Sequence, residues 1–177
     1  MRAPVLPRTE YRVVGVDPGL ANLGLGAVSE VGREATHVAS VLLRTDSRTP
    51  VAERIRALHD GVLGFLVEHE PDALAIEGQY FHQQKGTAFK VGQAVGVVLL
   101  AASMRDVPVF EYGPMEVKQA LVGSGRADKA QVAYMVRGML TLGPGHLNHH
   151  AADALALALT HLGARRVRQA ADRGSRR

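Results

Sequence analysis

The sequence predicts an α/β domain in which helices flank a mixed five-stranded sheet. Three β-rich runs separated by short turns come first, which favours an antiparallel meander. Two further apolar strands each follow a helix, so a helical crossover should place each of them parallel to the first strand. With 177 residues, 46% of them hydrophobic, the chain fits one domain with a sizeable core.

The meander is expected in the first quarter of the chain. Its first strand, at 11–16, is a β-rich run that stops at Asp17, directly before a Pro-Gly pair that signals a turn. Runs rich in apolar residues follow at 23–31 and 36–44. Because only short turns separate the three runs, neighbouring strands should be antiparallel.

The rest of the chain reads as helices interspersed with two strands. Thr49 and Pro50 begin the first helix as its cap and its first residue, and Pro71 ends it. Apolar residues at spacings of three and four give this helix one buried face. The later elements are expected, in order, as a strand at 72–77, a helix at 87–105, a strand at 107–111, helices at 114–122 and 127–140, and a last helix at 148–162.

Composition narrows the class of protein. The chain has no Cys, which excludes disulfides, thiolate metal sites and Cys nucleophiles. The longest nearly uninterrupted apolar run, 94–104, is too short to span a bilayer, so we expect a soluble, cytoplasmic protein without membrane association. One domain is expected at 12–163, between a flexible N-terminal extension at 1–11 and an Arg-rich tail at 164–177.

The charge distribution is uneven. The net charge is +4, yet the six Arg and one Asp of residues 164–177 alone give +5, which leaves −1 for the rest. The tail could bind phosphates or simply keep the chain soluble. All four Lys fall between residues 85 and 129, so the middle of the chain carries a local basic signal.

Two carboxylates end the two apolar strands that should be central in the sheet. Asp17 follows the first strand and Glu77 follows the fourth, with no Lys or Arg within seven positions after either. If these strands are parallel, both acids lie at one edge of the sheet, where ionised carboxylates repel unless a cation lies between them. A hard divalent metal suits such oxygen ligands. Taken singly, Asp17 would read as a turn residue and Glu77 as an exposed one.

A third element adds two more polar residues. His150 and Asp153 are three apart and share one face of a helix whose remainder is apolar almost all round. A buried Asp is costly unless compensated, although a first-turn acid is also favoured by the helix dipole. Carboxylates on two parallel strands and a helix are the arrangement of two-metal phosphodiester chemistry. A zinc site is the alternative, without a recognised ligand spacing, and it would use His146, His149, His150 and His161.

At this point the sequence resembles the RuvC family of Holliday-junction resolvases, within the ribonuclease-H-like superfamily. The resemblance covers residues 12–162, and its motifs fall in family order and spacing. They are GVDPG at 15–19, AIE at 75–77, KVGQA at 90–94, VFEY at 109–112, VKQALVG at 117–123, DKAQV at 128–132 and AADALALALTH at 151–161. GVDPG alone also resembles the phosphate loops of actin-like ATPases, but that fold needs a second such domain, for which 177 residues leave no room.

The resemblance implies a catalytic, metal-binding set. The family's acidic residues match Asp17, Glu77 and Asp153, and the remaining catalytic position matches His150, where the best-known members have Asp and some relatives have His. The implied cofactors are two Mg²⁺ or Mn²⁺ ions in each active site. An imidazole at position 150 could bind the metal, or it could position or deprotonate the attacking water.

The resemblance also implies DNA-contacting residues. The family's DNA-contacting lysines match Lys90, Lys118 and Lys129. The segment Gln79, Tyr80 and Phe81 follows Glu77 directly, and an aromatic ring there could stack on or wedge an unpaired base.

The implied function is resolution of four-way DNA junctions in recombination and DNA repair. A homodimer would nick two strands symmetrically by in-line water attack, leaving 5′-phosphate and 3′-hydroxyl ends, and a branch-migration complex could dock on it. Gly92 and Gly96, four apart on one helix, could allow close packing at the dimer interface. The alternatives are a related nuclease for another structured nucleic acid, such as an RNA–DNA hybrid, and a non-catalytic junction-binding module.

Overall fold

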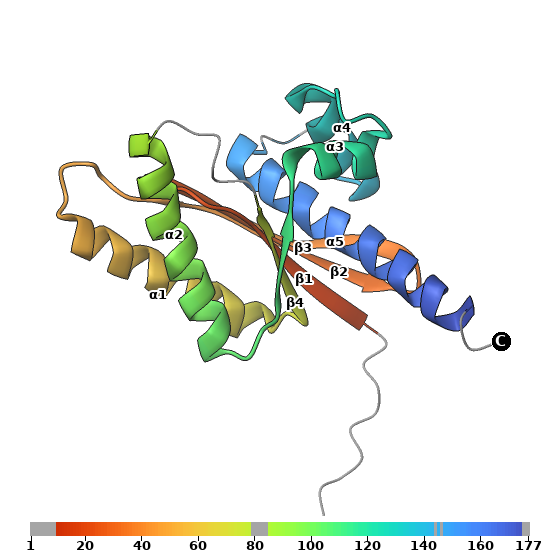
Figure 1. Ribbon diagram of the computed structural model, residues 1–177, viewed down its shortest axis with the longest axis horizontal. Coiled ribbons are helices and arrows are strands. Elements are labelled where there is room, and N and C mark those ends of the chain that lie inside the picture. Colours follow the sequence, from red (N-terminus) through yellow and green to blue (C-terminus); the bar gives the residue numbers. More distant parts are fainter. Residues whose placement is uncertain (1–9, 79–84, 144, 146, 175–177) are drawn as a thin grey trace, which may run out of the picture.

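The sheet in the centre of the molecule has the predicted mixed topology (Figure 1). The computed structural model describes residues 10–78, 85–143, 145 and 147–174. Within these residues, five strands form one sheet in the order β3-β2-β1-β4-β5. The strands are β1 (Glu10–Asp17), β2 (Asn22–Val31), β3 (Glu34–Arg44), β4 (Ala73–Glu77) and β5 (Val109–Tyr112). The β1–β2 and β2–β3 pairs are antiparallel, whereas β1–β4 and β4–β5 are parallel, so the predicted fold class is confirmed.

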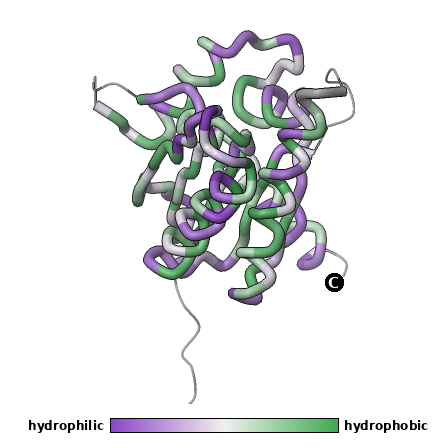
Figure 2. Tube along the Cα trace, turned by 90° about the vertical axis from the view of Figure 1, so that its left-hand side faces the viewer, coloured by the Kyte–Doolittle hydropathy of each residue, from purple (hydrophilic) through white to green (hydrophobic). Residues whose placement is uncertain are grey.

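Helices cover both faces of the sheet. The described helices are α1 (Val51–His69), α2 (Lys85–Met104), α3 (Pro114–Val122), α4 (Lys129–Met139) and α5 (His149–Gly174). One apolar core joins α1 and α2 to one face, and a second joins α3, α4 and α5 to the other. Figure 2 shows hydrophobic and hydrophilic residues alternating along the helices, as expected where each helix buries one side. No helix in the described part of the chain is long and apolar enough to cross a membrane.

Strand alternation decides which residues face α5. Successive side chains of a strand point to opposite faces, so Val13, Gly15 and Asp17 of β1 share one face. Val13 belongs to the core that contains α5, whereas Val14 belongs to the core of α1 and α2. Asp17 therefore lies on the α5 side of the sheet, and in β4 the same alternation carries Glu77 there with Ala75.

Glycines allow α5 to approach the sheet closely. A Cβ atom added at Gly15 would lie 1.8 Å from the carbonyl oxygen of Ala154, and one added at Gly24 would lie 2.2 Å from that of His150. No side chain fits at either position, because the main chain of the helix rests directly on the main chain of β1 and β2. This contact sets the distance between the first turns of α5 and the end of β1.

Helix α5 continues twelve residues beyond its predicted end at 162. The sequence predicted an end there because the apolar pattern fades after Leu162, but charge holds the extension in place. Arg165 and Arg166 both pair with Glu30 of β2, whose side chain is only 3% exposed. The Arg165 guanidinium also lies 3.7 Å from the ring centroid of Tyr11. The remaining described boundaries agree with the prediction to within two residues.

Candidate active site

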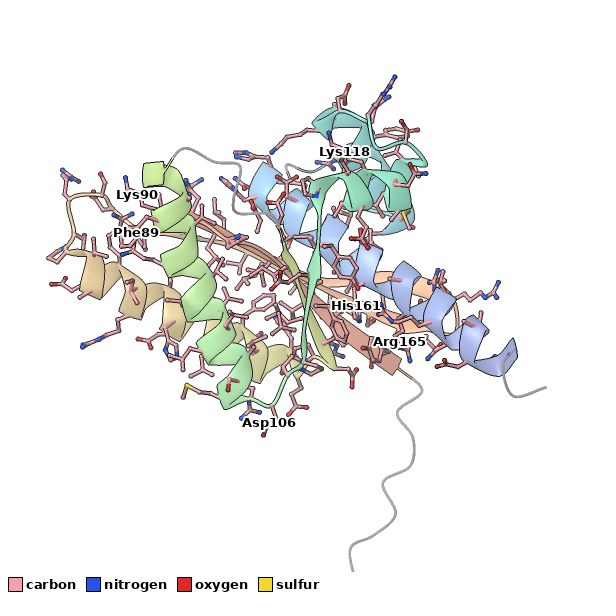
Figure 3. The ribbon with its side chains drawn as sticks, viewed as in Figure 1. Phe89, Lys90, Asp106, Lys118, His161 and Arg165 are labelled. Carbon is pink, nitrogen blue, oxygen red and sulfur yellow. The ribbon has the colours of Figure 1, made fainter. Side chains whose placement is uncertain are left out.

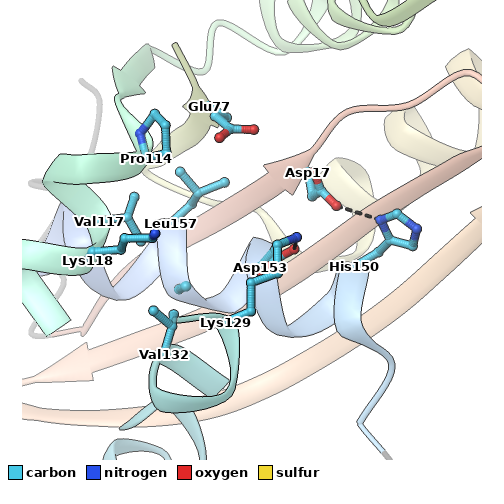
Figure 4. Close-up of a pocket in the computed structure, with 11 residues that line it drawn as sticks. Asp17, Glu77, Pro114, Val117, Lys118, Lys129, Val132, His150, Asp153 and Leu157 are labelled. Carbon is cyan, nitrogen blue, oxygen red and sulfur yellow. Dashed lines mark hydrogen bonds and ion pairs between the residues drawn. The ribbon is translucent and has the colours of Figure 1, made fainter. Parts of the chain in front are cut away.

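Four polar side chains from three elements line one cleft at the end of the sheet (Figure 4). Asp17 ends β1 and Glu77 ends β4, whereas His150 lies in the first turn of α5 and Asp153 follows it three residues later. Val16 and Ile76 are register partners in the parallel β1–β4 pair, so the acids that follow them leave the sheet side by side. The cleft has a volume of about 290 Å³. The structure thus brings together all four residues that the sequence singled out.

The first turn of α5 is fixed by its neighbours. The side-chain oxygen of Asn148 accepts a hydrogen bond from the His150 amide at 2.9 Å, and its carbonyl accepts one from Ala152 at 2.9 Å. On the sheet side of this turn, the His150 carbonyl lies in the space that a side chain at Gly24 of β2 would fill. Asn148 therefore caps α5, and Gly24 lets the helix pack closely on β2. Together they position His150 and Asp153 beside the ends of β1 and β4.

Asp17 and His150 are directly joined. The imidazole Nδ1 lies 2.6 Å from Oδ2 of Asp17, and an ionised carboxylate can only accept, so Nδ1 donates. Burial raises the pKa of Asp17, the hydrogen bond from His150 opposes that rise, and the negative charge of Asp153 adds to it. The Asp17 carboxylate is therefore costly to keep ionised, even with His150 beside it.

The other two carboxylates increase the crowding of negative charge. Burial raises the pKa of Glu77, and the charges of Asp17 and Asp153 raise it further. Asp153 is held by Lys129, whose Nζ donates to Oδ2 at 3.2 Å. The carboxylate of Asp153 is the largest cause of a raised pKa at Lys129. The cleft thus holds three acids close together, and among the described residues Lys129 is the lysine or arginine that contacts one of them.

The donor chemistry fits a divalent cation. Three carboxylates that repel one another, with an imidazole beside them, are the oxygen and nitrogen ligands that Mg²⁺ and Mn²⁺ accept. As the side chains lie, however, no three His, Asp or Glu residues in the described ranges are grouped closely enough to enclose an ion. His150 and Lys129 instead occupy carboxylate oxygens of Asp17 and Asp153. Metal binding would require these contacts to rearrange.

The residues predicted to contact DNA lie in different places. Lys118 of α3 and Lys129 of α4 line the cleft. Lys90 does not line it; Figure 3 shows it near the N-terminal end of α2, while Lys118 is on α3 across the molecule. Gln79, Tyr80 and Phe81, predicted to contact DNA, lie outside the described residues.

The zinc alternative receives no support from the described histidines. His161 is buried, with Nδ1 2.8 Å from the hydroxyl of Tyr112 and Nε2 3.3 Å from that of Tyr11. Burial lowers the pKa of His161 to about 4, with the charges of Arg168 and Arg165 adding to the effect. His149 has its ring 4.2 Å from that of His150, and no metal-sized cluster forms there among the described residues. His146 is not among the described residues.

Two contacts of the site were missed by sequence reasoning. The Asp17–His150 hydrogen bond joins distant segments, and no local pattern announces it. The Lys129–Asp153 pair had a partial signal, because the sequence DKAQ at 128–131 is a capping-box pattern. The Asp128 side chain accepts a hydrogen bond from the main-chain N–H of Gln131 at 2.8 Å. The Gln131 side chain in turn accepts one from the main-chain N–H of Asp128 at 2.9 Å. This motif locates the start of α4 and so the base of the Lys129 side chain.

The sheet order, the parallel β1–β4 pair and the acids at its end define a nuclease domain of the ribonuclease-H-like class. Residues 13–161 match the family model described as crossover junction endodeoxyribonuclease RuvC, and the chain belongs to this family. The resemblance identified from the sequence is thereby confirmed, as is the assignment to a class of enzymes that hydrolyse DNA.

Curated relatives and solved structures agree with this membership. The crossover junction endodeoxyribonuclease RuvC of Thermus thermophilus is 47% identical over 152 residues, covering 84% of this chain and 92% of the relative. That of Desulfitobacterium hafniense is 42% identical over 149 residues, covering 84% and 90%. The structure of Thermus thermophilus RuvC in complex with a Holliday junction substrate superposes with a TM-score of 0.85 at 46% identity, covering 89% of this chain and 96% of that one. A yeast mitochondrial Holliday junction resolvase, 14% identical with a TM-score of 0.59, shares the fold over 92% and 83% of the two chains.

Proposed function

We propose that this chain resolves four-way DNA junctions by hydrolysing phosphodiester bonds at the cleft between β1, β4 and α5. The observation that carries the proposal is the convergence of Asp17, Glu77 and Asp153, from three elements, on one open cleft. The structure of the Thermus thermophilus relative with a Holliday junction supports the substrate class. Nicks that leave 5′-phosphate and 3′-hydroxyl ends follow if water attacks the phosphorus in line with the 3′ oxygen.

Divalent metal dependence follows from membership of this nuclease family, and we propose two Mg²⁺ or Mn²⁺ ions. Asp17, Glu77 and Asp153 would hold them with carboxylate oxygens, and His150 is the fourth candidate ligand. When bound, such ions lower the pKa of a water nucleophile and stabilise charge on the leaving oxygen.

The protein's own residues supply position and charge. The ends of β1 and β4 present Asp17 and Glu77 from a hydrogen-bonded sheet, and α5 presents Asp153 from a helix seated on glycines. His150 holds a proton on Nδ1 against Asp17, which fixes the orientation of that carboxylate. Lys118, on another wall of the cleft, offers positive charge to a DNA phosphate.

A homodimer is the second part of the proposal, because symmetric nicking of a four-way junction requires two active sites. Helix α2 carries an apolar face that no described residue covers. An added Cβ at Gly92 or Gly96 would meet no atom of the described residues within 4 Å, so no described element packs there. Exposed apolar residues extend along the same helix at Phe89, Leu99, Leu100 and Met104. We propose that a second copy packs on this face through an isologous contact.

Docking of a branch-migration complex stays a prediction.

The test is a cleavage assay with three substrates in a series of divalent metals. A four-way junction should be cut in preference to a linear duplex and an RNA–DNA hybrid; preferential cleavage of the hybrid would contradict the substrate assignment. Asp17→Asn should slow junction cleavage by on the order of a thousandfold or more while junction binding in a gel-shift assay survives. Asp106→Asn is the matched control, because Asp106 is exposed and outside the cleft. Normal cleavage by Asp17→Asn would overturn the proposed site.

A further inference from the structure

Lys129 occupies a place in the cleft where a cation is needed. Its Nζ lies 3.2 Å from Oδ2 of Asp153, although its side chain is 83% exposed and that of Asp153 only 33%. Figure 4 shows the side chain reaching from the start of α4 over Asp153. The ammonium group therefore contacts a carboxylate of the proposed metal site, while most of the lysine side chain stays exposed to solvent.

The base of this side chain is fixed while its end is free to move. The reciprocal hydrogen bonds between Asp128 and Gln131 hold the first turn of α4, which includes the main chain of Lys129. Four methylene groups then separate that main chain from the ammonium group. A lysine built in this way can leave Asp153 by rotating its side chain, without any movement of the helix.

A divalent ion and this ammonium group compete for the same oxygen. The ion needs Asp153 together with Asp17 and Glu77, and like charges at such short range repel. Lys118 lines the same cleft, but within the described residues it forms no ion pair with Asp17, Glu77 or Asp153. Loss of either lysine would remove one positive charge from the cleft, yet only loss of Lys129 would free a metal ligand.

We propose that Lys129 is a displaceable counter-ion: it holds Asp153 in the metal-free enzyme and must be expelled from that carboxylate when the metal binds. The proposal rests on the proposed metal site. It assigns to Lys129 a role in metal loading, in addition to the DNA contact that the sequence predicted. Expulsion would release the ammonium group toward the open side of the cleft, where a phosphate can take it.

The test is calorimetric titration of DNA-free protein with Mn²⁺, which reads metal binding without cleavage. Lys129→Met keeps most of the length of the side chain and removes the charge. It should bind Mn²⁺ about fivefold more tightly than the wild type, as expected for a partly exposed ion pair. Lys118→Met, the matched control, loses the same charge in the same cleft and should change the affinity much less. Lys129→Arg keeps the charge with a stronger grip on a carboxylate and should bind Mn²⁺ more weakly.

The outcomes separate this inference from the proposed function. If Asp17→Asn abolishes Mn²⁺ binding but Lys129→Met and Lys118→Met change it equally, the metal site stands and the counter-ion role is wrong. If Lys129→Met binds Mn²⁺ no more tightly than the wild type, the role is also overturned. If Asp17→Asn binds Mn²⁺ as the wild type does, the proposed metal site itself fails. Thermal unfolding of each metal-free variant verifies that it is folded.

Discussion

His150 Nδ1 and Asp17 Oδ2 lie 2.6 Å apart although 133 positions separate the two residues. The bond joins the first turn of α5 to the end of β1 across the proposed metal site. Because Nδ1 carries a proton in this arrangement, it cannot bind a metal until that proton leaves. The imidazole therefore has two separable roles, as a metal ligand or as a group that orients Asp17 and a water.

Replacing His150 distinguishes these roles. His150→Asp restores a fourth carboxylate, and we expect the variant to remain active with its preference shifted toward Mg²⁺, which favours hard oxygen ligands. The measurement is the ratio of junction-cleavage rates in Mg²⁺ and Mn²⁺. His149→Asp, a change at the adjacent exposed histidine, should leave the ratio unchanged. Complete inactivity of His150→Asp in every metal would instead favour proton transfer by the imidazole.

The glycine at position 24 should control cleavage without touching substrate. Gly24→Ala places a methyl group 2.2 Å from the His150 carbonyl oxygen, so the first turn of α5 must move away from β2. We expect a loss of about 1–3 kcal/mol in the free energy of unfolding and a drop in cleavage of roughly a hundredfold. Denaturant unfolding and single-turnover cleavage measure the two effects.

Gly64 provides the control for this substitution. It lies exposed in α1, and an added Cβ would meet nothing within 4 Å. Gly64→Ala should be neutral or stabilise the protein by up to about 1 kcal/mol, because alanine favours helix. Unchanged cleavage by Gly24→Ala would show that the close contact between α5 and β2 does not position the residues of the site.

The apolar face of α2 predicts the oligomeric state. Leu100→Glu introduces a charge into the proposed interface and should convert a dimer into a monomer in light scattering coupled to gel filtration. Val167→Glu, at an exposed apolar residue near the far end of α5, should leave the dimer intact. A wild-type monomer at micromolar concentration, or a Leu100→Glu dimer, would rule out this interface.

His161 predicts a stability that declines in acid. Its pKa is about 4 in the folded protein and about 6.5 when unfolded, so between these values the unfolded chain binds more protons. Its contribution is complete above about pH 6.5 and is lost as the pH falls toward 4, by roughly 3 kcal/mol at most. His161→Phe should be less stable at pH 7.5, because Tyr112 loses a partner, yet its stability should change less between pH 7 and 4.5. Equal pH dependence of the two proteins would contradict this assignment.

The spacing of apolar residues and the order of strands and helices made much of this fold predictable. Two apolar strands reached by helical crossovers were expected to run parallel, and Asp17 and Glu77 then had to leave the same edge of the sheet. The three-residue spacing of His150 and Asp153 likewise placed both on one helix face. These inferences needed only local patterns and general rules of chain connection.

Other features depended on contacts between distant segments. The capping box at 128–131 locates the main chain of Lys129, but it does not show that the ammonium group contacts Asp153, because that contact depends on how α4 packs against α5. The closeness of α5 to the sheet was also hidden, since glycines in a strand are compatible with a turn, a bulge or a close contact. The predicted end of α5 was wrong because a pattern of apolar residues gives no sign of helical turns that are stabilised by ion pairs.

The pairing of Arg165 and Arg166 with Glu30 also bears on where the folding unit ends. The family match stops at residue 161, but a chain trimmed there would leave the nearly inaccessible carboxylate of Glu30 without its two guanidinium partners. A buried charge that loses its partner is strongly destabilising. The end of the family match therefore differs from the end of the segment that stabilises the fold through ion pairs. A truncated protein intended for crystallisation or assay should retain at least residue 166.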